Sequence, residues 1–289
     1  MQRSSGRGFC AFRHADYDAY MSNHPFRGLA LHTWTVDTTP LPEALAAAKS
    51  GGFDAIELRR IDFTRHPDAL QIVKNSGMPV ACIGVEPGWL FSRKGDEQER
   101  LFAVFRETCQ NAVTLGCPTL MSSIGPGETG LDEAVANIGR AGKIAAEFKL
   151  RLAVEYQFQH PVMKSLAIVR DAVKRAGHPS VGVLLDAYHL QRGGLPGAGF
   201  RDMPDSEIFY VQFSDVPDAP PNGPPPTDRL PAGKGLVRWT ELLKLLAAKN
   251  YRGFLSYEAP NPTHWNKPAA ETAREGADAI RRQLATAFA

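Results

Sequence analysis

The sequence predicts a single-domain α/β protein with the (β/α)8 TIM barrel architecture. Three observations support this fold: the length of 289 residues, an eightfold alternation of short apolar runs with amphipathic stretches, and the sequence LHTWTVDTTP after the first run. Alternating strands and helices of this number fit one barrel, which commonly exceeds the size of an average domain. The alternative fold, a doubly wound sheet, typically has a glycine-rich phosphate loop after its first strand, and LHTWTVDTTP contains none.

Eight short apolar runs are the expected strands, and most of them end in polar residues. In chain order they are GLALHTW (28–34), FDAIELR (53–59), PVACIGV (79–85), TLMSSIG (119–125), RLAVEYQ (151–157), VGVLLDAYH (181–189), IFYVQFSD (208–215) and GFLSYEAP (253–260).

The stretches between these runs repeat apolar residues at helical spacing. Clear examples are LPEALAAAKSGG, ERLFAVFRETCQNAVTLG, LDEAVANIGRAGKIAAEFK, MKSLAIVRDAVKRAG and WTELLKLLAAKN. Several of them end in glycine, which is favoured just past a helix C-terminus. The sixth connection, QRGGLPGAGFRDMPDSE, is short and irregular.

Two segments stand apart from this pattern. Residues 1–24 are expected to form a polar, poorly ordered tail before a barrel of residues 25–289, and Met21 is an alternative to Met1 as the translation start. The loop at 216–233 carries seven prolines, which stiffen an excursion without building a helix. We interpret this loop either as a lid over the barrel mouth or as a surface insertion.

Composition and charge exclude several classes of protein. The 33 basic and 31 acidic residues form no block of like charge, so we expect no nucleic-acid partner. The four cysteines show no CxxC pair, which argues against a zinc ribbon or a disulfide framework and suits a reducing compartment. No apolar run is long enough for a signal peptide or a membrane span, so we expect a soluble cytoplasmic protein without a membrane partner.

Polar residues at the ends of the last four strands indicate a metal site. Chemistry in this barrel gathers at the carboxyl ends of the strands, where Glu155, Asp186, Gln212 and Glu258 should converge. A single acidic residue after a strand is usually a helix cap or an ion-pair partner, but three close carboxylates repel strongly and need a counter-charge. Few basic residues lie near these ends. One divalent metal is the simplest solution, and four oxygen ligands favour Mn²⁺ or Mg²⁺, with Co²⁺ or Zn²⁺ possible.

Two further residues at strand ends are candidates for the site. His189 lies three residues beyond Asp186 and is interpreted as a catalytic or supporting residue, with a structural histidine as the alternative. Glu57 is a candidate for substrate binding, or else for an ion pair with Arg59 or Arg60.

The remaining candidates are expected to bind substrate. His32 and Trp34 end the first strand and either line a pocket or pack in the core. Arg229, in the proline-rich loop, is expected to meet an anionic substrate, with a solvated surface arginine as the alternative.

The motifs FDAIEL, LAVEYQ, LLDAYHL, QFSD and LSYE, in this order, resemble the xylose isomerase-like TIM barrels, which include sugar-phosphate isomerases and epimerases. RLPAGKGLVRW resembles the Pro-Gly-x-Gly turn of the family, although Ala232 here separates Pro231 from Gly233. The similarity covers nearly the whole chain beyond the tail. By position, it implies the metal ligands Glu155, Asp186, Gln212 and Glu258.

Gln212 departs from the histidine that many members of this family carry. An amide oxygen should favour Mn²⁺ or Mg²⁺ over Zn²⁺. A glutamine here resembles the branch that includes 3-dehydroshikimate dehydratases, in which the barrel eliminates water.

The resemblance implies an enzyme that abstracts a proton next to a carbonyl. The metal would stabilise the enediolate, and Glu155 and Glu258 would act as acid and base on opposite faces of a small sugar, cyclitol or keto-acid. In the lyase alternative, His189 would protonate the leaving hydroxyl or assist proton abstraction. No phosphate-binding loop is evident, which favours an unphosphorylated substrate.

Two other hypotheses of function are compatible with a barrel of this kind. One is a non-catalytic barrel subunit that binds a metal or sugar. The other is a nuclease of the endonuclease IV type, which would need more histidine and acidic ligands and a basic face. Exposed barrel helices make a homodimer possible.

Overall fold

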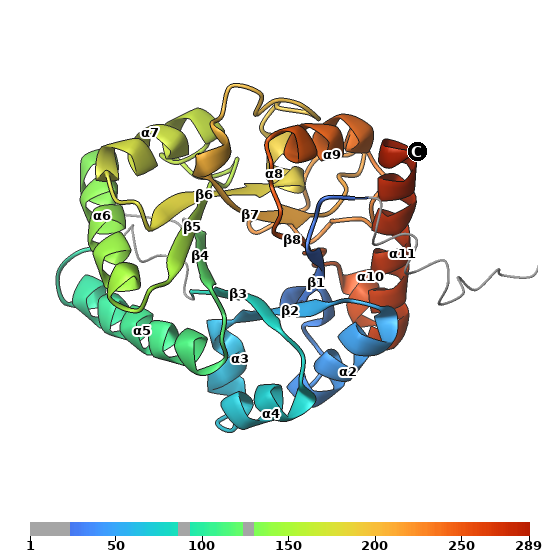
Figure 1. The fold of residues 1–289 in the computed structure, drawn as a ribbon, viewed down its shortest axis with the longest axis horizontal. Helices are drawn as coiled ribbons and strands as arrows, with labels where there is room; N and C mark the ends of the chain where they lie inside the picture. Colours follow the sequence, from blue (N-terminus) through green and yellow to red (C-terminus); the bar gives the residue numbers. More distant parts are fainter. Residues whose placement is uncertain (1–23, 86–92, 124–129) are drawn as a thin grey trace, which may run out of the picture.

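Eight parallel strands form a closed barrel in the computed structural model, which describes residues 24–85, 93–123 and 130–289 (Figure 1). The strands are β1 (Gly28–His32), β2 (Ala55–Arg59), β3 (Val80–Gly84), β4 (Thr119–Ser123), β5 (Arg151–Glu155), β6 (Val181–Asp186), β7 (Ile208–Phe213) and β8 (Phe254–Tyr257). Each pairs with the next along the chain, and β8 pairs with β1 to close the ring. The predicted (β/α)8 barrel is confirmed.

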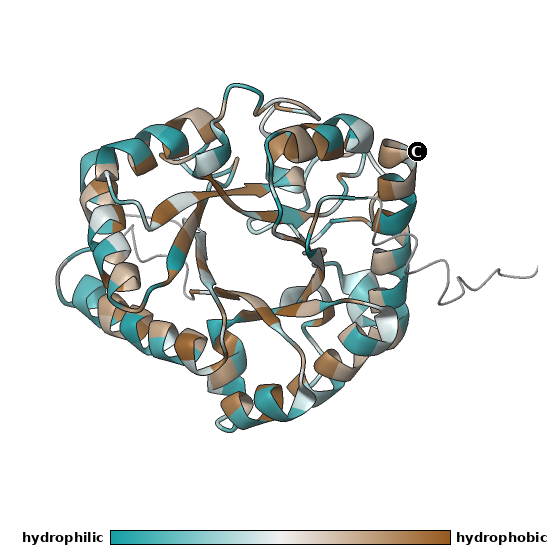
Figure 2. Cartoon of the chain, in the orientation of Figure 1, coloured by the Kyte–Doolittle hydropathy of each residue, from teal (hydrophilic) through white to brown (hydrophobic). Residues whose placement is uncertain are grey.

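Helices surround this ring of strands (Figure 1). They are η1 (Thr33–Val36), α2 (Leu41–Gly51), α3 (Arg60–Arg65), α4 (Ala69–Ser76), α5 (Gly95–Thr114), α6 (Leu131–Glu147), α7 (Leu166–Ala176), α8 (Ala187–Arg192), η3 (Asp205–Glu207), α9 (Trp239–Ala248), α10 (Pro262–Trp265) and α11 (Ala269–Phe288). Figure 2 shows apolar residues along the strands and hydrophilic residues on the outer faces of the helices. No helix in the described ranges is long and apolar enough to cross a bilayer.

Side chains along each strand alternate between two buried layers, because successive residues of a strand point to opposite faces. The outer layer packs against the helices, whereas Ala55, Ala153, Leu184 and Tyr210 belong to a second cluster inside the barrel. The next inward position on each strand comes two residues later, at the mouth. This alternation places Glu57, Glu155, Asp186 and Gln212 there.

The strands end earlier than the sequence pattern predicts, because polar side chains start helical turns. The run 181–189 is expected to leave its strand before His189 and enter a loop, but the Asp186 carboxylate accepts from Tyr188 N at 2.9 Å and residues from Ala187 on form α8. Similarly, His32 Nδ1 accepts from Trp34 N at 3.0 Å, and η1 begins at Thr33. The expected tail, including Met21, falls outside the described residues except for His24.

Asp215, just after β7, fixes the proline-rich loop at both ends. Its backbone exchanges two hydrogen bonds with Leu230, of 2.7 and 3.0 Å. Its buried carboxylate accepts from Gly233 N at 2.7 Å and from Trp239 Nε1 at 2.8 Å, and also from the backbone of Val216 and Val237. These contacts hold the loop beside the end of β7.

Replacing Asp215 with asparagine should destabilise the barrel. An amide presents only one acceptor oxygen, so some of the buried N–H groups that face this carboxylate would lose their partner. We expect the free energy of unfolding to fall by about 2–4 kcal/mol, as measured by urea denaturation. Asp218→Asn, at an exposed position of the same loop, is the matched control and should change stability little. Equal effects of the two substitutions would contradict this role of Asp215.

Candidate active site

Four strand ends bring the predicted ligands into one buried cluster at the barrel mouth. Asp186 of β6 lies directly opposite Gln212 of β7 in the strand register. Glu155 ends β5, and Glu258 follows β8 with its backbone N–H still bonded to the carbonyl of Phe213. All four predicted ligands are buried. A group of three acidic side chains and one amide thus lies where the sequence places it.

The amide of Gln212 presents an oxygen that no described residue satisfies. Gln212 Nε2 donates to Glu57 Oε1 at 2.9 Å, whereas Gln212 Oε1 is buried and has no hydrogen-bond partner in the described part of the chain. Glu155 Oε1 is in the same situation. Buried polar atoms are rarely left without a partner. Two free oxygens at the mouth fit a bound cation, and the residues present therefore suit the expected metal.

His189 lies against two of the predicted ligands. One ligand atom each of Glu155, Asp186 and His189 lies within 4.8 Å of the other two, and His189 Nε2 is 3.7 Å from an oxygen of each carboxylate. Tyr156 and Tyr188 pack near its ring. Burial lowers the pKa of His189 to about 4, so its imidazole is neutral near pH 7. The geometry suits either a metal ligand or a proton-transferring group.

Arg229 is buried inside the cluster, so the alternative of a solvated surface arginine was wrong. Its Nη1 donates to Asp186 Oδ2 at 2.7 Å and to Glu258 Oε2 at 2.8 Å. The guanidinium also lies 4.5 Å from the centre of the Tyr188 ring. The expectation that few basic residues lie near the strand ends needs a correction, because this arginine supplies one positive charge from the loop.

One arginine does not balance the carboxylates around it. Burial, reinforced by Glu258 and Asp186, raises the pKa of Glu155 well above its usual value. Burial likewise raises the pKa of Glu258 to about 7, although Arg229 opposes the rise. The protein alone thus disfavours full ionisation, and a divalent cation would relieve this.

Glu57 has a different partner from those expected. Its side chain is fully buried and accepts from Gln212, whereas Arg59 pairs with Asp37 and Arg60 lies 3.7 Å from Glu107. The alternative of an ion pair with Arg59 or Arg60 was therefore wrong. Burial, followed by the charge of Glu258, raises the pKa of Glu57 to about 8.

His32 bridges the two sides of the mouth. Its Nδ1 accepts from Trp34 N, and burial lowers its pKa well below the usual value, so the proton of the neutral ring is on Nε2. This Nε2 lies 3.5 Å from Glu258 Oε1 and 3.8 Å from Glu57 Oε1. Trp34 is half-buried, and its carbonyl accepts from Trp265 Nε1. Substrate contact by His32 and Trp34 stays a prediction.

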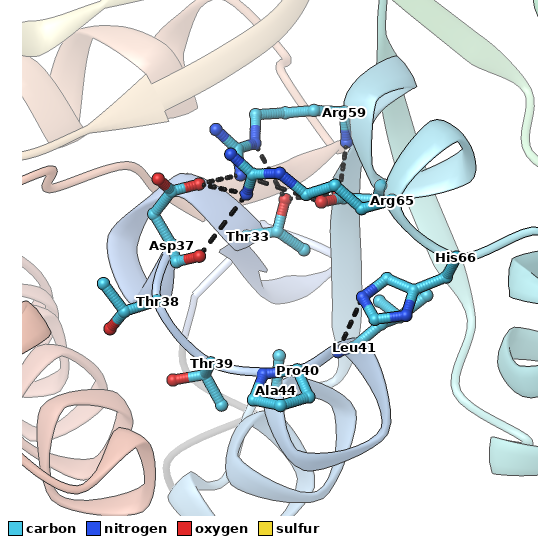
Figure 3. Close-up of a pocket in the computed structure, with 11 residues that line it drawn as sticks. Thr33, Asp37, Thr38, Thr39, Pro40, Leu41, Ala44, Arg59, Arg65 and His66 are labelled. Carbon is cyan, nitrogen blue, oxygen red and sulfur yellow. Dashed lines mark hydrogen bonds and ion pairs between the residues drawn. The ribbon is translucent and has the colours of Figure 1, made fainter.

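A cavity of about 340 Å³ lies between η1, the start of α2 and α3, at the same end of the barrel. Figure 3 shows Arg59 and Arg65 turned toward Asp37, and the Arg65 contact measures 2.8 Å. Asp62 accepts from Thr33 Oγ1 at 2.7 Å. Sequence reasoning did not predict this cavity. None of the four predicted ligands lines it, and acidic side chains balance its arginines.

Residues 45–283 match the family model of the xylose isomerase-like TIM barrel. The chain belongs to this family. Among curated relatives, a 3-dehydroshikimate dehydratase of Pseudomonas putida is 27% identical over 84% of this chain, which spans only 39% of the length of that protein. An inosose isomerase of Halalkalibacterium halodurans is 22% identical over 84% of this chain and 91% of its own length.

Solved structures of similar proteins agree on the fold. A crystal structure of the IolI protein with a bound zinc atom superposes with a TM-score of 0.79 at 17% identity, covering 91% of this chain and 99% of the other. A fusion of a xylose isomerase-like TIM barrel with a 4-hydroxyphenylpyruvate dioxygenase gives a TM-score of 0.78 at 21% identity, over 91% of this chain and 45% of the other.

Removing the charge of Arg229 should destabilise the protein. In Arg229→Met, the Asp186 and Glu258 carboxylates lose their shared buried donor, and we expect a loss of about 3–5 kcal/mol in unfolding free energy. Calorimetric or urea unfolding in the presence of a metal chelator measures this loss. Arg201→Met, at an exposed position, is the control. An Arg229→Met protein as stable as this control would show that the carboxylates do not depend on the guanidinium.

Proposed function

We propose that this protein is a divalent-metal-dependent enzyme that abstracts a proton next to a carbonyl of a small sugar, cyclitol or keto-acid, with net isomerisation or epimerisation. The observation that carries the proposal is the cluster at the barrel mouth, where Gln212 Oε1 and Glu155 Oε1 are buried without a partner in the described residues. Glu155, Asp186, Gln212 and Glu258 would hold the cation. Their oxygens favour Mn²⁺ or Mg²⁺.

Two carboxylates from different strands suit the proton transfers. The bound cation supplies Lewis acidity that polarises the substrate carbonyl. Glu155 then takes the proton from the neighbouring carbon, and Glu258 returns a proton on the opposite face. Arg229 holds Glu258 in place through a hydrogen bond of 2.8 Å, and His32 Nε2 lies 3.5 Å from the other Glu258 oxygen. A positioned carboxylate contributes about 10²–10⁴-fold to such a step.

A lyase of the 3-dehydroshikimate dehydratase type is the second candidate. It is supported by Gln212, by the resemblance to that branch and by the Pseudomonas putida relative. The same proton abstraction would be followed by loss of a hydroxyl group. The buried His189, 3.7 Å from Glu155 and Asp186, would take the abstracted proton from Glu155 and deliver it to that leaving group, so that water departs and the ring is neutral again.

The purified protein should contain about one divalent metal per chain, and the double variant Glu155→Ala/Glu258→Ala should lose it. Mass spectrometry of metals in the dialysed proteins measures this content. The double variant Glu97→Ala/Glu147→Ala removes two exposed helical carboxylates instead and should retain the metal. A wild type that stays metal-free even after incubation with Mn²⁺ would refute the proposed mechanism.

The enzyme should exchange an acidic C–H of its substrate with solvent. Proton NMR in D₂O, with an inosose and with 3-dehydroshikimate as probes, follows this exchange and the product together. Glu155→Gln should slow the exchange by about 10²–10⁴-fold. A rearranged product would support the isomerase, and an aromatic product formed with loss of water, slowed by His189→Gln, would support the lyase. Lack of exchange with either probe or a wider panel of sugars and keto-acids would favour the non-catalytic reading.

A further inference from the structure

The amide of Gln212 ends in two groups, an oxygen and an NH₂ group, which are similar in shape and opposite in hydrogen-bonding character. Its oxygen can bind a cation, whereas its NH₂ group can only donate. Rotation of the amide by half a turn would direct the NH₂ group at the metal. A glutamine in this position therefore needs a neighbour that fixes its orientation.

Glu57 is placed to be that neighbour. It comes from β2, on the other side of the barrel, and its Oε1 lies 2.9 Å from Gln212 Nε2. Both side chains are fully buried, so water does not compete for this contact. His32 Nε2 lies 3.8 Å from the same Glu57 oxygen, beyond hydrogen-bond distance. Glu57 Oε1 accepts from Gln212 Nε2, and an acceptor is what the NH₂ group requires.

The alternative orientation is unfavourable for a simple reason. Against the ionised carboxylate of Glu57, it would bring Gln212 Oε1 to hydrogen-bond distance of Glu57 Oε1, two acceptors with no proton between them. It would also direct the NH₂ group, which can only donate, at the proposed metal. The observed orientation leaves Oε1 without a partner in the described residues.

We propose that Glu57 is a positioning residue, which turns the amide of Gln212 so that its oxygen faces the metal. The inference rests on the proposed function, because it assumes that a cation binds at the mouth. It gives Glu57 a role other than the substrate contact expected from the sequence. Partners that orient metal ligands typically change metal affinity by about 10–100-fold when they are removed.

Calorimetric titration with MnCl₂ tests the role of Glu57. Glu57→Leu removes the acceptor and should weaken Mn²⁺ binding by about 10–100-fold. Glu57→Gln removes the same carboxylate but can still present an oxygen to Gln212, so it should retain most of the affinity. The difference between these variants isolates the acceptor from the charge. Equal affinities of the two variants would overturn the proposal.

The same substitution of Glu57 in a Gln212→Glu protein distinguishes loss of amide orientation from structural disruption of the site. In Gln212→Glu both terminal atoms are oxygens, so the side chain needs no orienting partner. Glu57→Leu should then cause no loss of Mn²⁺ affinity in this background. An equal loss in both backgrounds would indicate a merely structural role and would overturn the proposal.

Two outcomes distinguish this inference from the proposed function. A wild type that binds Mn²⁺, combined with an unaffected Glu57→Leu variant, refutes the positioning role alone. A wild type that binds neither Mn²⁺ nor Mg²⁺, Co²⁺ or Zn²⁺ refutes both.

If Glu57→Leu does not fold, ¹⁵N NMR of the metal-free wild type replaces it. The side-chain NH₂ signal of Gln212, assigned by its absence in Gln212→Glu, should show slowed exchange with solvent and a response to Glu57→Gln. An NH₂ group that exchanges freely would overturn the proposal.

Discussion

Closing eight parallel strands into one barrel forces the inward side chains at their carboxyl ends toward a common axis. In this protein those positions carry Glu57, Glu155, Asp186, Gln212 and Glu258, and all five are buried. Their polar atoms are removed from water, so each needs a partner inside the mouth. The internal contacts of the site follow from this demand, since acidic groups so close together must be neutralised, paired or protonated.

Arg229 meets part of that demand, and it does so from a loop. The guanidinium of Arg229 contacts Asp186 and Glu258 because the proline-rich loop returns over the barrel mouth. Two sets of contacts hold the loop there. The Asp215 carboxylate accepts hydrogen bonds from buried N–H groups, and Asn261 Nδ2 donates to the carbonyl oxygen of Arg229 at 3.0 Å. Loop stability and site electrostatics are therefore linked, because the residues that fix the loop also fix the charge.

The pattern of apolar and polar residues predicts those features of this protein that depend on neighbours in the sequence. Alternation with a period of two identifies Glu155 and Asp186 as inward residues at strand ends, and the repeat of strands and helices predicts the barrel. The same reasoning fails where contacts are distant in sequence. Glu57 and Gln212 are 155 residues apart, and sequence proximity wrongly suggested Arg59 or Arg60 as the partner of Glu57. The burial of Arg229 also leaves no local signal, since a proline-rich loop has no periodicity from which to infer an inward face.

The identity of the proposed ligand at the end of β7 has consequences for the rest of the barrel. A histidine bound to a metal through one ring nitrogen has its donor on the opposite edge of the ring, whereas a glutamine carries donor and acceptor on one carbon. An acceptor must therefore bind the NH₂ group of the amide if the amide oxygen is to face the metal. A carboxyl group suits this task because one of its oxygens accepts in either protonation state. Glu57 of β2 reaches Gln212 of β7 across the barrel interior, and the pairing of β2 with β3 shifts register between Ile56 and Glu57. If Gln212 holds the proposed metal through its oxygen, glutamine at this position and glutamate on β2 act as one unit, in which a change of either residue alters what the other can do.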